Sequence, residues 1–129
     1  MGQVEAGRYP VLRGPHPIGG VHLDPVNIIS SPRRFYFSGD FIRDCFDKLG
    51  PYIASCHAKD VAWDAEMQIH FREVPLGTGA LDYTTYLKRL AALPTDVPLM
   101  IEHMKGAEEY NASRRYLFEL AGKIGVTFE

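Results

Sequence analysis

The chain has 129 residues, 46% of them hydrophobic and 23% charged, and its formal net charge is -2. This length suffices for one domain with a buried core, whereas a closed eight-stranded barrel typically needs about 250 residues. The slightly acidic balance argues against nucleic acid as a partner, and no apolar run approaches the roughly 18 residues of a membrane span.

Three features at the level of composition predict the compartment and the start of the fold. Cys45 and Cys56 are predicted to be free, buried side chains rather than a disulfide, which favours a reducing compartment. The N-terminus lacks the apolar stretch of a secretory signal, so we expect a cytoplasmic protein. Residues 1–19 are rich in glycine and proline without hydrophobic periodicity, which predicts an irregular lead-in rather than a domain.

The first half of the remaining chain alternates strand and helix. A short apolar run predicts a strand over 21–24, followed by a loop over 25–37. Ser38 is the predicted N-cap of a helix that continues to residue 49, where Gly50 and Pro51 stop it. A second apolar run predicts a strand over 52–57.

The second half begins with a long connection over 58–81, a length typical of a functional lid. Within it, alternation around His70 predicts a short strand, with His70 and Arg72 on its polar side. The sequence Gly77-Thr-Gly79 indicates either a tight turn or a cradle of N–H groups for an anion. A helix capped by Asp82, a strand over 97–102 and a helix over 107–123 complete the chain. The last helix is predicted to bury Tyr110, Leu117, Leu120, Ala121 and Ile124.

Each predicted strand ends in a residue type that binds metals, namely Asp24, His57 and Glu102. The strand–loop–helix order, repeated three times, predicts an α/β fold that is part of a (β/α)8 TIM barrel, with parallel strands inside and helices outside. Function in such barrels resides at the carboxyl ends of the strands, so the three side chains are expected to converge. Singly, each has a structural reading, as a turn Asp, a hydrogen-bonded His or a solvated Glu. Together they indicate a site for a hard divalent cation or a substrate.

Four motifs occur in a familiar order: Gly20-Val-His-Leu-Asp-Pro-Val-Asn27, Ser55-Cys-His-Ala-Lys-Asp60, Pro75-Leu-Gly-Thr-Gly-Ala-Leu-Asp-Tyr83 and Met100-Ile-Glu-His103. From about residue 19 onward the chain resembles the C-terminal part of sugar phosphate isomerases/epimerases of the xylose isomerase-like TIM barrel superfamily. The resemblance implies that residues 20–129 form the C-terminal portion of such a barrel. It also implies a divalent cation (Mn, Mg, Co or Zn), for which Asp24, His57 and Glu102 match the last three of four ligands.

The resemblance further implies a metal-dependent sugar or sugar phosphate isomerase/epimerase that transfers a proton through an enediolate. Glu102 would be the catalytic acid–base group as well as a ligand, and Asn27, Lys59 and Arg72 would contact the substrate. The family's first ligand, a Glu, would lie upstream of Met1. We therefore expect a chain that is inactive alone and that self-associates or pairs with the N-terminal part of the barrel.

Two other functions are considered. The first is a non-catalytic remnant or assembly module of the same fold, because open sheet edges drive association. The second is a DNA-repair nuclease like endonuclease IV, from the same superfamily, with three zinc ions. These nucleases carry Asp-x-x-His where this chain has Asp24-x-x-Asn27, and Asp-x-His where residues 71–73 read Phe-Arg-Glu. Two ligand motifs fail, so we favour the isomerase.

Overall fold

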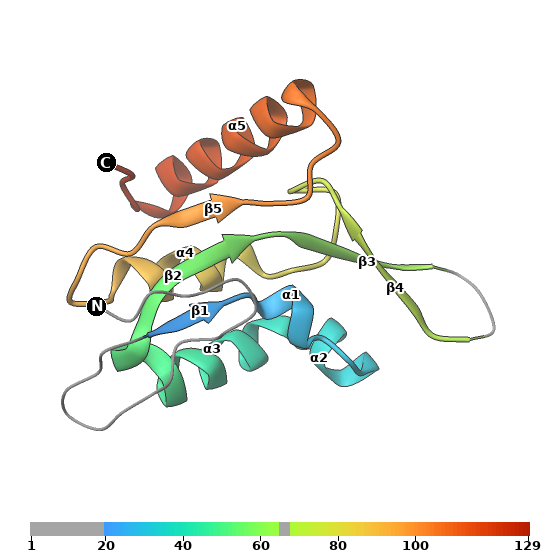
Figure 1. Cartoon of the computed structure of the whole chain (residues 1–129), viewed down its shortest axis with the longest axis horizontal. Coiled ribbons are helices and arrows are strands. Elements are labelled where there is room, and N and C mark those ends of the chain that lie inside the picture. The colour runs from blue at the N-terminus through green and yellow to red at the C-terminus, as the bar shows by residue number, and fades with distance from the viewer. Residues whose placement is uncertain (1–19, 65–67) are drawn as a thin grey trace.

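A parallel sheet forms the centre of the computed structural model, which describes residues 20–64 and 68–129. The sheet has three strands in the order β1 (Val21–Leu23), β2 (Ile53–Ala58) and β5 (Leu99–Ile101) (Figure 1). All three predicted strands are therefore present, each shorter or shifted by one or two residues. The predicted lead-in over 1–19 lies outside the described residues.

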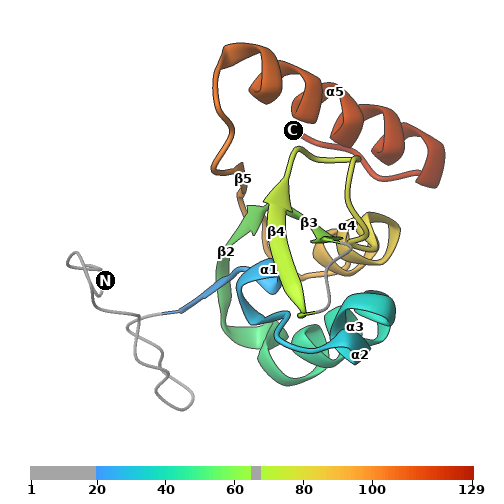
Figure 2. The same ribbon diagram turned by 90° about the vertical axis from the view of Figure 1, so that its right-hand side faces the viewer.

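Three longer helices follow the three strands: α3 (Ser38–Leu49), α4 (Tyr83–Ala91) and α5 (Ala107–Ile124). Figure 2 shows α3 and α4 on the same side of the sheet, and α4 packs against both α3 and α5. A short 3-10 helix (Gly50–Tyr52) turns the chain from α3 into β2. Parallel strands with helices on one side confirm the predicted α/β class and the partial TIM barrel. No helix in the described ranges is long and apolar enough to cross a membrane.

The core lies between the sheet and the helices, and both cysteines are buried in it as free thiols, as predicted. On α5 the buried residues are Ser113, Leu117 and Ala121. Tyr110, predicted to face inward, is 40% exposed because the first turns of α5 extend beyond this buried stripe. The most completely buried side chains, all at most 1% exposed, include Leu23, Ile42, Cys56, Tyr83, Tyr86 and Leu87.

The segment over 25–37, predicted to be a loop, instead contains two short helices, α1 (Pro25–Ile28) and α2 (Pro32–Tyr36). Each begins at a proline, whose fixed φ suits the first helical position. Asp24 and Ser31 cap them by accepting hydrogen bonds from the backbone N–H groups two residues beyond each proline. The caps were readable in the sequence as Asp-Pro and Ser-Pro. The helices are too short for hydrophobic periodicity to predict them.

The long connection over 58–81 is largely a β-hairpin, and its function as a lid stays a prediction. Its strands β3 (Asp60–Asp64) and β4 (His70–Val74) pair antiparallel and project beyond the sheet (Figure 1). The short strand predicted around His70 is confirmed. An aromatic cluster joins the hairpin to α2, since Phe35 stacks on Phe71 with ring centroids 5.4 Å apart and also contacts Trp63.

One buried carboxylate holds the base of the hairpin and the glycine loop together. Asp60 is 1% exposed and accepts hydrogen bonds of 2.9–3.0 Å from the backbone N–H groups of Val61, Gly77, Gly79 and Leu81. A Cβ atom on Gly79 would lie 2.4 Å from Asp60 Oδ1, so the approach requires glycine. The glycine-rich turn therefore does present N–H groups to an anion, and that anion is the protein's own side chain.

Replacing this carboxylate with an amide is expected to destabilise the chain. Asp60→Asn removes the charge and places an NH2 group against backbone donors, which should lower the free energy of unfolding by roughly 2–4 kcal/mol. Urea denaturation measures the change. The matched control is Asp64→Asn, because Asp64 pairs with Arg72 on the surface of the same hairpin and should cost at most about 1 kcal/mol. Equal losses in the two variants would contradict the role of Asp60.

Candidate metal centre

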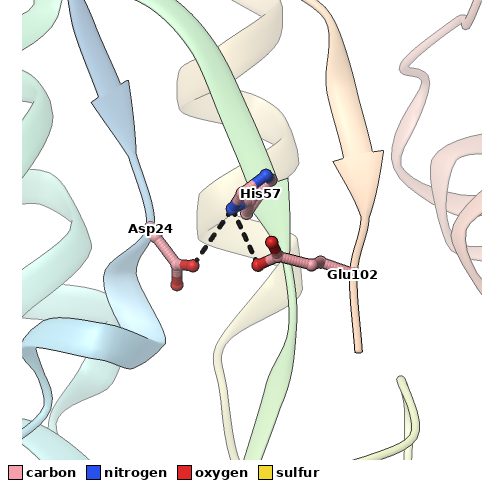
Figure 3. Close-up of side chains that lie close together, drawn as sticks. All are labelled: Asp24, His57 and Glu102. Atoms are coloured by element: carbon pink, nitrogen blue, oxygen red, sulfur yellow. Dashed lines mark hydrogen bonds and ion pairs between the residues drawn. The ribbon is translucent and has the colours of Figure 1, made fainter. Parts of the chain in front are cut away.

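Asp24, His57 and Glu102 converge at the carboxyl ends of the three parallel strands. Their potential ligand atoms all lie within 4.8 Å of one another, and Figure 3 shows the three side chains pointing toward a common centre. Nδ1 of His57 is 3.3 Å from Asp24 Oδ2 and 2.9 Å from Glu102 Oε2. The parallel register makes this possible, because His57 lies at the end of β2 while Asp24 and Glu102 directly follow β1 and β5, so all three lie at the same edge of the sheet.

Local structure positions the two acids. Asp24 is 7% exposed and divides its two oxygens, with Oδ1 capping α1 at Asn27 N (3.3 Å) and Oδ2 facing the site. Glu102 extends the pairing of β5, since its N–H donates to Ala58 O at 3.3 Å. The two acids therefore start from fixed backbone positions.

Two tyrosines of α4 hold the backbone at the C-terminal end of β2 through hydrogen bonds. The Tyr86 hydroxyl donates to His57 O at 2.8 Å, and the Tyr83 hydroxyl donates to Lys59 O at 2.6 Å. Burial raises the pKa of both phenols well above the usual value, so both remain donors. Neither tyrosine was predicted to take part in the site.

A further histidine supports the ring of His57. His22 lies edge-on to it with ring centroids 3.9 Å apart, and its Nδ1 is hydrogen-bonded to the Ser55 hydroxyl. Burial, together with the nearby His57, holds the pKa of His22 below its usual value. A neutral His22 adds no positive charge beside the acids.

Lys59 is the centre of the charge network. Its ammonium Nζ lies 2.9 Å from Asp24 Oδ2, 3.0 Å from Glu102 Oε2, 3.2 Å from Glu73 Oε1 and 3.1 Å from Asn27 Oδ1, while the side chain is 3% exposed. Burial by itself lowers the pKa of a lysine, but the hydrogen bonds to Asp24, Glu102 and Glu73 outweigh it and raise the pKa above the usual value. The lysine is therefore charged and fully partnered.

Glu102 has the opposite shift. Partial burial raises the pKa of its carboxyl group, but the hydrogen bond from Lys59 and the charge of His57 lower it further than burial raises it. The net pKa lies below the usual value, so Glu102 is a carboxylate that can accept a proton or bind a cation.

Glu73 and His103 belong to the same network and were not predicted. His103 Nδ1 is 2.7 Å from Glu73 Oε2, and His103 has a positive φ of 61°, uncommon for a residue with a side chain. Glu73 lies on β4 on the face opposite Arg72, because strand residues alternate. One signal was available: residues 71–73 occupy the position where the nucleases carry ligands.

The three predicted substrate residues separate into two groups. Asn27 and Lys59 are in the network and bond to each other. The structure does not bring Arg72 there, since its side chain is exposed and its Nε lies 2.5 Å from Asp64 Oδ1 across the hairpin.

The donor set fits a divalent cation. Two carboxylate oxygens and an imidazole nitrogen are suitable ligands for Mn²⁺, Mg²⁺, Co²⁺ or Zn²⁺. Within residues 20–64 and 68–129, these three side chains are the cluster with suitable spacing. The same two oxygens, Asp24 Oδ2 and Glu102 Oε2, also bind the ammonium of Lys59.

Comparison with solved structures identifies the class of fold. The chain matches the crystal structure of a xylose isomerase domain protein from Planctomyces limnophilus with 30% sequence identity and a TM-score of 0.60. The match covers 82% of this chain and 37% of that protein, so the chain spans well under half the length of its structural relative. The chain therefore has the fold of part of a xylose isomerase-like barrel, and the resemblance seen in the motifs is confirmed at the level of fold. No family model and no curated protein sequence matches the chain.

Removal of the central ammonium should destabilise the protein. Lys59→Met leaves Asp24 and Glu102 facing each other without a positive charge, and breaking a buried ion pair from one side costs about 3–5 kcal/mol. Urea denaturation in the presence of EDTA measures this. Lys48→Met is the matched control, because Lys48 is 71% exposed and pairs with Asp44 on the surface of α3. A loss at Lys59 no larger than at Lys48 would show that the network contributes little.

Proposed function

We propose that this chain carries the metal-binding part of a sugar or sugar phosphate isomerase/epimerase. The observation that carries the proposal is the convergence of Asp24, His57 and Glu102 within 4.8 Å at the carboxyl ends of parallel strands. The xylose isomerase-like fold supports it, since chemistry in TIM barrels takes place at this end.

Each residue has a defined task in this proposal. Asp24, His57 and Glu102 would hold the cation, which when bound supplies a Lewis acid for neighbouring carbonyl and hydroxyl oxygens of the sugar. Glu102, whose lowered pKa keeps it ionised, would also act as the acid–base group on one face of the sugar, taking the proton from the carbon beside the carbonyl group to give an enediolate. The family's further Glu would deliver a proton on the opposite face. Asn27 and Lys59 offer polar contacts to substrate hydroxyl groups, whereas Arg72 is left out.

The ligand, the cellular compartment and the association of the chain are proposed on separate grounds. We propose sugar as the ligand in preference to nucleic acid, because two nuclease ligand motifs fail, one at Asn27 and the other at residues 71–73. Buried free thiols at Cys45 and Cys56 support a reducing compartment such as the cytoplasm. In the described sheet, β1 and β5 pair only with β2, so each offers an edge to a second copy or to another part of a barrel.

Binding of Mn²⁺ tests the metal site directly. Isothermal titration of the purified chain should give one site, and Asp24→Asn or Glu102→Gln should each weaken binding by about tenfold or more, because each removes a charged ligand. Asp47→Asn serves as the control, since Asp47 lies on the surface of α3 and pairs with Arg89. Binding that is insensitive to Asp24 and Glu102 would place the metal elsewhere.

Turnover is expected to need more than the 129 residues. Epimerisation requires one group to remove the proton and another to deliver it, and loss of one acid–base group typically costs 10²–10⁴-fold. We expect little or no isomerisation of a ketose panel by the chain with Mn²⁺, Mg²⁺ or Co²⁺. Activity should rise when a separately made N-terminal barrel segment carrying the further Glu is added.

Glu102→Gln in the mixed sample is the control and should abolish the gain. Robust turnover by the chain alone would contradict the expectation. A folded oligomer that binds no metal would instead favour the assembly module.

A further inference from the structure

We propose that Lys59 is an internal counter-cation that occupies the acidic pair of the site in the metal-free protein and must shift toward Glu73 and Asn27 before a divalent cation binds. The inference rests on the proposed metal site and adds a control element to it. It makes Lys59 a determinant of metal affinity rather than only a substrate contact.

Lys59 and the proposed cation share the same ligand atoms. Nζ of Lys59 lies 2.9 Å from Asp24 Oδ2 and 3.0 Å from Glu102 Oε2, the same two oxygens that His57 Nδ1 contacts. A divalent cation bonds carboxylate oxygens at about 2.0–2.6 Å. A metal ion bound there would bring a second positive charge against the pair of carboxylate oxygens that the ammonium contacts. The ammonium and the metal therefore compete for these oxygens.

Lys59 already has other partners. Glu73 Oε1 at 3.2 Å and Asn27 Oδ1 at 3.1 Å both contact the ammonium, and neither residue belongs to the Asp24–His57–Glu102 set. Glu73 is contributed by the hairpin and Asn27 by α1. A displaced ammonium would therefore keep one carboxylate and one amide oxygen rather than become an unpaired buried charge.

The backbone of Lys59 is held in place, so that its side chain can move independently. The carbonyl of Lys59 accepts the Tyr83 hydroxyl at 2.6 Å, and the next residue, Asp60, is fixed by its own backbone hydrogen bonds. The flexible four-carbon stem of lysine allows the ammonium to move without moving the strand. The ammonium can therefore offset part of the charge of the carboxylates in either position.

The test measures Mn²⁺ affinity by isothermal titration and by the electron paramagnetic resonance signal of free Mn²⁺. Lys59→Met should bind Mn²⁺ about tenfold or more tightly than the wild type, since no ammonium has to be displaced. Lys48→Met makes the same change in net charge on an exposed face of α3 and should leave the affinity within about twofold. Glu73→Gln should weaken binding, because the shifted ammonium loses its carboxylate.

The double variant distinguishes competition from simple charge. If Glu73 acts by receiving Lys59, the effect of Glu73→Gln should largely disappear in the Lys59→Met background. A plain loss of one negative charge would instead weaken binding equally in both backgrounds, and that result would overturn the proposal. Lys59→Gln provides a second variant with a neutral donor, in case Lys59→Met folds poorly without metal. Thermal unfolding with EDTA and with Mn²⁺ should show a larger metal-induced rise in Tm for both Lys59 variants than for the wild type.

The outcomes separate this inference from the proposed function. Equal Mn²⁺ affinity in the wild type and the Lys59 variants, with loss of binding in Asp24→Asn, would overturn the competition and leave the metal site standing. Weaker binding in the Lys59 variants would also overturn it. Absence of Mn²⁺ binding in every variant would refute both the metal site and the inference.

Discussion

The buried carboxylate of Asp60 is the constraint on which the arrangement of the site depends. A carboxylate that is almost fully buried must have its oxygens satisfied, and here backbone N–H groups from both sides of the hairpin satisfy them. This joins the start of β3 to the glycine loop that leads into α4. Lys59 directly precedes Asp60, and Val74, opposite Asp60 in the hairpin, directly follows Glu73. The same interaction therefore sets the positions of both side chains at the edge of the sheet.

The site is best understood as a balance of charge at that edge. Three carboxylates, from Asp24, Glu73 and Glu102, surround one ammonium, and His57 lies against two of them. Such a cluster is stable only when a cation occupies it, because carboxylates this close would otherwise repel one another. Lys59 is that cation in the structure. A divalent metal offers an alternative with more charge and closer contacts, which connects the stability of the fold to the chemistry proposed for it.

Much of the fold was open to prediction because the residues themselves carry the periodicity. The strand ends at Asp24, His57 and Glu102 follow apolar runs, and the helices α3, α4 and α5 show recurrent apolar spacing, so the partial barrel could be derived. The short helices α1 and α2 could not, because they last about one turn and only their caps mark them. The hairpin was seen in part, since alternation marked β4 but nothing local shows that β3 is its partner.

The sequence by itself determined the order of elements, the class of fold and the ends of the strands where polar side chains gather, because hydrophobic periodicity and turn residues are local properties. Only the tertiary structure decided which charges meet. Glu73 lies on β4 of the hairpin, and His103 lies in the loop between β5 and α5. Their contact depends on how these two segments pack. Likewise, the backbone N–H groups of Gly77 and Gly79 donate to Asp60, which lies at the start of the hairpin that precedes this turn. Contacts between segments distant in sequence follow from packing of the whole chain, and no single stretch of residues encodes them.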